Sequence, residues 1–178
     1  RQLGAMLNGL AQLPMPTVAL VQGNAYGGGI GLIAACDIVV AGPRASFAPW
    51  YTRVGYSPDG GWTALMPERI GRARTLDIQL TNRRLDAEEA HHVGLVNRVV
   101  SLDKVDARAY ELAREMADLA PLSHSRHKRI LQTVLRDPSL MGLTPGEEDL
   151  PFANFDSEDF QEGRSAFLER RPPHFKGR

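Results

Sequence analysis

The chain has 178 residues, of which 43% are hydrophobic and 24% are charged, which is an ordinary globular composition and enough for a domain with a core. Its 21 acidic and 21 basic residues give a formal net charge of zero, so no global field favours nucleic acid as a partner. The single cysteine, Cys36, excludes an intramolecular disulfide framework and fits a reducing compartment, which we expect to be the cytoplasm.

Strands and helices alternate along the first hundred residues, and helices alone follow. Apolar periodicity, breaker residues and capping residues predict where each element lies. The predicted helices cover 1–13, 29–36, 63–70, 72–80, 86–92, 103–119, 122–135 and 157–170, and the predicted strands cover 17–22, 38–41, 46–48 and 95–100. This order predicts an α/β fold with parallel strand pairing. Proline, glycine and aromatic residues predict an ordered loop at 49–61, and a second loop is predicted at 137–155.

The least charged run, residues 17–36, is about long enough to span a bilayer. Its glycines and its changes of period indicate a buried core and not a membrane helix, so we expect no membrane partner.

The most informative segment is the glycine-rich stretch at residues 23–31, Gly-Asn-Ala-Tyr-Gly-Gly-Gly-Ile-Gly, which lies between two apolar runs. Consecutive glycines cost conformational entropy, and they let the backbone N–H groups of a helix start face a ligand directly. Such a turn holds a phosphate or the oxyanion of a carbonyl. Taken alone, the segment also fits a tight packing turn that binds nothing.

Neither nucleotide-binding fingerprint fits this stretch. A P-loop needs Lys and then Ser or Thr after its last glycine, whereas Leu32 follows Gly31 here. A dinucleotide site needs a different glycine spacing and an acid about 20 residues later, and no acid occurs between Asp37 and Asp59.

Further motifs follow the glycines in a fixed order. They are Cys36-Asp37-Ile38, Gly55, Pro58-Asp59-Gly60-Gly61, Leu80-Thr81-Asn82-Arg83-Arg84-Leu85, Ala87-Glu88-Glu89-Ala90, Gly94-Leu95-Val96 and the tail pattern Glu162-Gly163 with Ala166-Phe167-Leu168-Glu169-Arg170-Arg171. Together, in register over nearly the whole chain, they resemble the crotonase superfamily, the enoyl-CoA hydratase/isomerase group. The run Ser57-Pro58-Asp59-Gly60-Gly61-Trp62 is most similar to the phenylacetate-pathway enoyl-CoA isomerases.

The resemblance implies a crotonase-type ββα superhelix with a C-terminal helical trimerisation region. Residues 1–102 then form the C-terminal portion of the core, and residues 103–178 form the helical region that mediates trimerisation and covers coenzyme A. The expected assembly is a homo-trimer or hexamer. Because the first helix has no N-cap residue, we also expect an N-terminal part of the fold outside this chain.

The resemblance also implies a thioester site that needs neither a metal nor a cofactor, since coenzyme A belongs to the substrate. The N–H of Gly28 matches one of two oxyanion donors, and the other donor is expected outside this chain. The remaining matches to substrate-binding positions are Asn24, Ala25, Gly27, Trp50 and Tyr51.

The acidic positions separate the possible reactions. Hydratases of this group use two glutamates, and the matching positions here are Gly31 and Tyr51, neither of which titrates near neutral pH. Asp59 matches the aspartate that does the chemistry in the isomerases and in a dehalogenase of the group. We expect nearby aromatic rings to desolvate Asp59 and to raise its pKa into the range of a usable base. The alternative for Asp59 is a helix cap at Gly60.

The predicted function is therefore double-bond isomerisation of an enoyl-CoA, with Asp59 as the acid/base. Three alternatives stay open: hydration, nucleophilic attack by Asp59 of the dehalogenase or thioesterase type, and a catalytically silent subunit. In the basic tail, the resemblance implies that Arg170 binds the nucleotide phosphates of coenzyme A, with Lys176 as a further contact. Pairing of such cations with the helix dipole is the simpler alternative.

Overall fold

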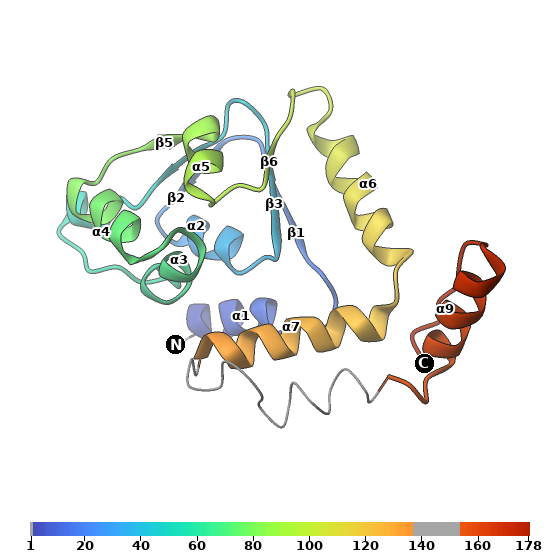
Figure 1. Ribbon diagram of the computed structural model, residues 1–178. Helices are drawn as coiled ribbons and strands as arrows, with labels where there is room; N and C mark the ends of the chain where they lie inside the picture. The colour runs from blue at the N-terminus through green and yellow to red at the C-terminus, as the bar shows by residue number, and fades with distance from the viewer. Residues whose placement is uncertain (1, 137–153) are drawn as a thin grey trace. The chain divides into compact units, whose positions relative to one another are not determined.

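The computed structural model describes residues 2–136 and 154–178 (Figure 1). The chain divides into two compact units. The first comprises Arg1–Leu13 and Thr17–Leu112, and the second comprises Pro14–Pro16 and Ala113–Arg178. All of the predicted loop at 137–155, except its last two residues, lies outside the described residues.

The first unit contains two small sheets, each with three strands. The first has the order β1 (Val18–Val21), β3 (Ile38–Ala41) and β6 (Arg98–Val99), all parallel. The second has the order β2 (Asn24–Tyr26), β4 (Ser46–Ala48) and β5 (Leu85–Asp86), with β2 parallel and β5 antiparallel to β4. The predicted parallel pairing is thus confirmed, with one antiparallel exception.

Helices connect and cover these strands (Figure 1). In the first unit they are α1 (Gln2–Ala11), α2 (Gly28–Ala34), the 3₁₀ helix η1 (Thr52–Val54), α3 (Trp62–Ile70), α4 (Arg72–Thr81) and α5 (Ala87–Val93). The helix α6 (Val105–Ala117) crosses from the first unit into the second, which also contains α7 (Pro121–Arg136) and α9 (Glu158–Glu169). Helix α2 packs against α3, and α3 packs against α4.

The strands differ from their predictions in length and burial. The segment predicted as a buried strand at 17–22 buries only Val21 fully, and Leu20 on β1 is 37% exposed. The predicted strand at 95–100 shortens to β6, while Leu95 and Val96 pack in the core before it. Strand β3 agrees with its prediction, because its β-branched residues Val39 and Val40 are completely buried in the middle of the sheet.

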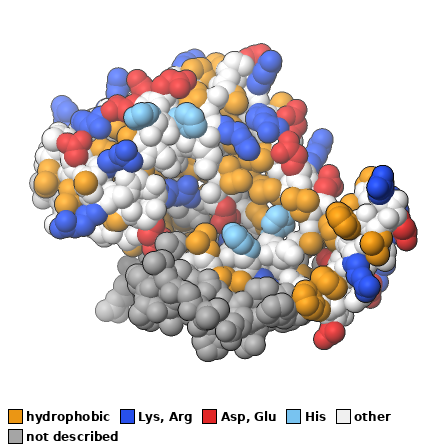
Figure 2. Space-filling model, viewed as in Figure 1, with side chains coloured by type: hydrophobic (Ala, Val, Ile, Leu, Met, Phe, Trp, Pro, Cys, Tyr) orange, Lys and Arg blue, Asp and Glu red, His pale blue; other side chains and the backbone are white. Residues whose placement is uncertain are grey.

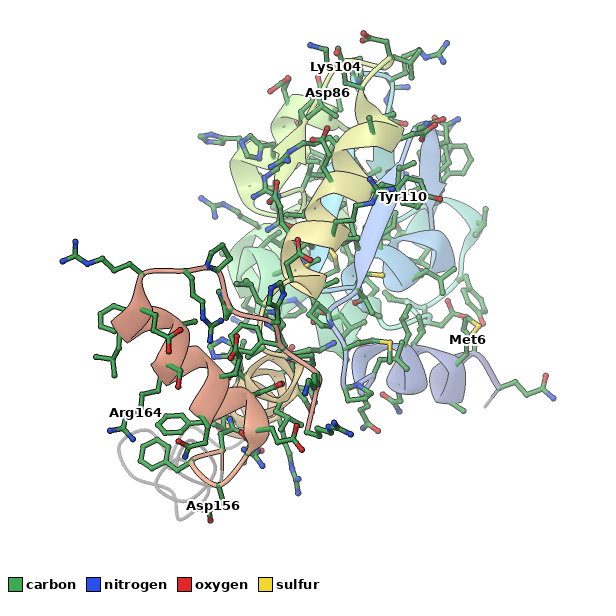
Figure 3. The ribbon with its side chains drawn as sticks, turned by 90° about the vertical axis from the view of Figure 1, so that its right-hand side faces the viewer. Met6, Asp86, Lys104, Tyr110, Asp156 and Arg164 are labelled. Carbon is green, nitrogen blue, oxygen red and sulfur yellow. The ribbon has the colours of Figure 1, made fainter. Side chains whose placement is uncertain are left out.

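Helix α5 begins where its sequence predicts. The carboxylate of Asp86 accepts a hydrogen bond from the Glu89 N–H at 2.8 Å, which satisfies one of the open donors of the helix start. The side chain of Glu89 does not complete a capping box, because it pairs with Arg83. Figure 3 labels Asp86 at this helix start.

No helix among the described residues is long and apolar enough to cross a membrane. The uncharged run at 17–36 contains β1, β2 and the short helix α2 and is not one continuous helix. On the face drawn in Figure 2, acidic and basic side chains are interspersed, in keeping with the balanced net charge of the chain.

In the second unit, the C-terminal tail folds back onto α9. The buried carboxylate of Asp159 accepts hydrogen bonds from the backbone N–H groups of Lys176 and Gly177, at 2.6 and 2.9 Å. Glu162 binds the guanidinium of Arg171, which lowers the pKa of Glu162 to about 2. Phe167 on α9 remains 83% exposed. The trimerisation role that the resemblance implies for this region stays a prediction.

Candidate active site

The first turn of α2 presents backbone donors that have no partner. Gly27 is the N-cap, with φ 53° and ψ −126°, and it provides no side chain to cap the helix. Its own N–H donates to the Ala48 carbonyl at 3.0 Å, which ties the turn to the end of β4. Among the described residues, no acceptor meets the N–H of Gly28 or Gly29. These N–H groups at the positive end of α2 can therefore donate hydrogen bonds to a negatively charged oxygen.

The loop that contains Gly60 packs against this helix start. A Cβ atom added to Gly31 would lie 1.6 Å from the carbonyl oxygen of Gly60, and one added to Gly60 would lie 2.9 Å from Cα of Gly28. The backbone of the 59–61 loop thus rests directly on the first turn of α2. At Gly31, where the hydratases that the sequence resembles carry a glutamate, this contact leaves no room for any side chain.

Asp59 lies in that loop, next to Gly60. Its carboxylate accepts a hydrogen bond from the Tyr56 hydroxyl at 3.3 Å, and its backbone carbonyl accepts hydrogen bonds from the Tyr51 hydroxyl and the Trp62 N–H, both at 3.1 Å. Two expectations are wrong. The side chain of Asp59 is exposed and not desolvated, although the Tyr56 hydroxyl contacts one of its carboxylate oxygens. Asp59 also does not cap α3, whose N-cap is Gly61 without any side-chain bond.

Tyr51 is only 5% exposed. Its ring stacks on Tyr56 with centroids 6.3 Å apart and meets the buried Trp62 edge-on at 6.4 Å. Burial, and then the negative charge of Asp59, raise the pKa of Tyr51 to about 12. Tyr51 is therefore a neutral hydrogen-bond donor throughout the physiological pH range. The sequence predicts this, because a tyrosine stands where the hydratases carry a glutamate.

A spectroscopic titration tests this environment. The unfolded phenol ionises near pH 10, while the folded one keeps its proton up to about pH 12. Between these values the unfolded state binds fewer protons than the folded state, so the stability contributed by Tyr51 should fall as pH rises from about 10 to 12. We expect a tyrosinate absorbance step near pH 12 that disappears in Tyr51→Phe. A difference spectrum with no change above pH 11 would contradict the buried donor.

Trp50 adopts a left-handed backbone conformation, with φ 60°. Its ring stacks on Tyr26 at 5.3 Å and 12° between planes, and the Arg53 guanidinium lies 5.2 Å from its centroid. Because Tyr26 directly precedes Gly27, this stack lies beside the turn that begins α2. Trp50 is 41% exposed and therefore has surface available for a ligand, although a substrate contact stays a prediction.

Asn24 and Ala25 belong to β2 and serve its packing. The side-chain oxygen of Asn24 accepts a hydrogen bond from the Ser46 hydroxyl at 2.9 Å, and Ala25 is 7% exposed. A ligand contact from Asn24 or Ala25 stays a prediction. Sequence reasoning did not predict β2, because a three-residue strand flanked by glycines has no detectable period.

Arg170 and Lys176 both belong to the second unit. Arg170 is the left-handed C-cap of α9, with φ 54°, and its guanidinium has no ion-pair partner in the described part of the chain. The ammonium of Lys176 lies 3.7 Å from the Glu158 carboxylate. Their binding of coenzyme A phosphates stays a prediction.

Sequence reasoning counted Tyr56 among the aromatic residues beside Asp59, but it missed their hydrogen bond and the part played by Gly60. Tyr56 lies three residues before Asp59, and Gly60-Gly61 is a visible doublet. These signals indicate a turn, but they do not reveal that the turn rests on α2. The arrangement as a whole is chemically able to hold a carbonyl oxygen on N–H groups while a neighbouring carboxylate moves a proton. The fold is α/β, and the site combines a helix start with free N–H groups and an acidic loop packed against it.

Comparison with known proteins gives the family. The family model for enoyl-CoA hydratase/isomerase matches residues 2–178, and the chain belongs to this family. Methylglutaconyl-CoA hydratase, mitochondrial, of Rattus norvegicus is 34% identical over 180 residues, covering 99% of this chain and 57% of the relative. Carnitinyl-CoA dehydratase of Salmonella arizonae is 38% identical over 177 residues, covering 97% of this chain and 67% of the relative.

A solved structure shares the fold. The enoyl-CoA hydratase of Bacillus anthracis superposes with a TM-score of 0.94 at 31% identity, over 99% of this chain and 68% of that one. The predicted crotonase fold is thereby confirmed. The chain spans between 57% and 68% of the length of these proteins.

Proposed function

We propose that this chain belongs to an acyl-CoA enzyme that moves a carbon–carbon double bond within an enoyl-CoA thioester. In the proposed reaction, the Asp59 carboxylate removes a proton from a carbon of the acyl chain. The electron pair shifts toward the thioester carbonyl, whose oxygen becomes an enolate held by the Gly28 N–H. Asp59 then returns the proton to another carbon, so that the double bond has moved and no atom is gained or lost.

The observation that carries this proposal is the contact between Gly31 and Gly60. A Cβ atom at position 31 would lie only 1.6 Å from the Gly60 oxygen, so no carboxylate can stand there. Tyr51 occupies the second position at which the hydratases carry a glutamate. Its phenol is buried, and its pKa is raised to about 12. Addition of water by a pair of carboxylates is therefore not supported by these positions, whereas a single acid/base, Asp59, is enough for isomerisation.

The oxyanion donor is supported by the unpartnered N–H of Gly28 at the start of α2. A preorganised donor of this kind is worth about 3–4 kcal/mol in the transition state. The proximity of Gly60 to Gly28 brings the neighbouring residue, Asp59, to the same helix start, which suits transfer of a proton next to the bound carbonyl.

Hydration of an enoyl-CoA is the second candidate, because relatives at 34–36% identity carry the name hydratase. In that reaction Asp59 would act alone on the attacking water. The two candidates differ in their products, since isomerisation conserves the mass of the substrate whereas hydration adds one water.

The test is Asp59→Asn in the protein that carries this chain, assayed with a few enoyl-CoA thioesters that differ in the position of the double bond. The substitution keeps the shape of the side chain and removes the base. We expect the Asp59→Asn variant to form the isomer at least about 100-fold more slowly than the unchanged protein. Its affinity for the thioester should change little. Mass spectrometry of the products distinguishes the shifted isomer from a hydrated one.

Ser57→Ala is the matched control, because it changes an exposed neighbour in the same loop and leaves the carboxylate in place. Turnover by Asp59→Asn close to that of the control would rule out Asp59 as the base. A hydrated product from the unchanged protein would favour the second candidate, and no turnover of any thioester would favour a silent subunit.

A further inference from the structure

We propose that Tyr51 and Tyr56 are positioning residues that hold Asp59 from two sides, Tyr51 through the backbone and Tyr56 through the carboxylate. This inference rests on the proposed function, because Asp59 must be the acid/base for its position to affect the rate. It assigns a role to the aromatic residue at the position where the hydratases carry a glutamate.

Tyr51 provides the fixed end of this arrangement. Its ring is buried against Trp62, which is 2% exposed. From this anchored ring, the hydroxyl donates to the Asp59 carbonyl at 3.1 Å. The Trp62 N–H donates to the same oxygen. The carbonyl of Asp59 is thus held by two donors, both of which belong to the packed part of the first unit.

Tyr56 provides the second contact. Its ring stacks on Tyr51, and its hydroxyl donates to Oδ2 of Asp59 at 3.3 Å. A hydrogen bond to one carboxylate oxygen restricts rotation of the side chain and leaves the other oxygen available to a substrate. Tyr56 itself is 56% exposed, so its contact with Tyr51 is what places it.

The Asp59 side chain needs such restraints because the two residues that follow it provide no side-chain contacts. Gly60 and Gly61 follow Asp59 with φ of 54° and 80°, conformations that glycine adopts readily and that impose no side-chain packing. The exposed carboxylate would otherwise sample several rotamers. A displacement of about 1 Å at a reacting group can lower the rate about 100-fold. Two hydrogen bonds that hold Asp59 in one position should therefore raise the rate of proton transfer.

The experiment compares Tyr51→Phe and Tyr56→Phe, each of which removes one hydroxyl and keeps the ring. We expect kcat for isomerisation to fall by about tenfold in each variant, a part of the cost of a misplaced group, with KM unchanged within a factor of two. Ser57→Ala is the matched control, since it removes an exposed hydroxyl from the same loop and leaves both tyrosines in place. Its kcat should stay that of the unchanged protein.

A double-mutant cycle separates positioning from general stabilisation. On the Asp59→Asn background no base remains to be placed, so Tyr51→Phe and Tyr56→Phe should lower the residual kcat by less than twofold. Full additivity of the tyrosine and Asp59 substitutions would overturn the inference. So would unchanged kcat in both single variants, or a rise in KM with constant kcat.

The cycle also separates this inference from the proposed function. If Asp59→Asn itself retains activity, the proposed function fails, and no positioning role remains. If Asp59→Asn loses activity while both phenylalanine variants keep a normal kcat, the proposed function stands and the positioning role is wrong.

Discussion

Replacing Gly31 with alanine is expected to lower the free energy of unfolding by about 3 kcal/mol or more, at the upper end of the usual cost of overpacking. The new methyl group would lie 1.6 Å from the carbonyl oxygen of Gly60 and 2.7 Å from its carbonyl carbon. These are backbone atoms, so no side-chain rotation relieves the clash. Urea unfolding monitored by circular dichroism measures the loss.

Gly29→Ala is the matched control, because it lies in the same helix and a Cβ atom there meets nothing within 4 Å. Alanine is favoured over glycine in a helix by up to about 1 kcal/mol, so this variant should be as stable as the unchanged protein or more stable. Equal free energies of unfolding for the Gly31 and Gly29 variants would contradict the contact between α2 and the 59–61 loop.

The second large effect is expected from Gly28→Pro, which removes the proposed oxyanion donor. Loss of one such donor lowers kcat by about 10²–10³-fold. Gly28 is the first residue of α2, where proline removes no intrahelical hydrogen bond and its fixed φ suits the helix. We therefore expect a folded protein with very little isomerase activity. The assay is paired with a thermal melt to verify that the variant is folded.

Gly28→Ala is the control for that experiment, because alanine keeps the N–H and its Cβ atom would have only Leu3 nearby, at 3.8 Å. The alanine variant should retain far more activity than the proline variant. Comparable activity in the two variants, both folded, would exclude the Gly28 N–H as an oxyanion donor.

Local sequence was enough to predict several elements of the fold. Strand β3 is a β-branched run that ends at Gly42, and α5 begins at an Asp86 that caps it; in both cases the information lies within a few neighbouring residues. The same holds for the glycine-rich start of α2. The ordered set of motifs then predicted the family, which the comparison confirms over residues 2–178.

Contacts between distant segments were not predictable in this way. Strand β2 exists because Asn24–Tyr26 pairs with Ser46–Ala48, a partner about twenty residues away. The nearby aromatic residues predicted a desolvated Asp59, whereas its side chain is exposed in the folded chain. The pairing of β2 and the exposure of Asp59 depend on contacts between residues that are separated in the sequence. Local sequence patterns do not predict such contacts.

Position 31 shows the division between the two sources of information. The sequence by itself determined that no acid stands there and that a glycine-rich turn begins a helix. Only the tertiary structure decided why a glycine is needed, since the carbonyl of Gly60, from a loop almost thirty residues away, occupies the space of a side chain. Local backbone preferences act within a few residues, so the local sequence determines them. Steric exclusion between a loop and a helix arises only when the chain packs.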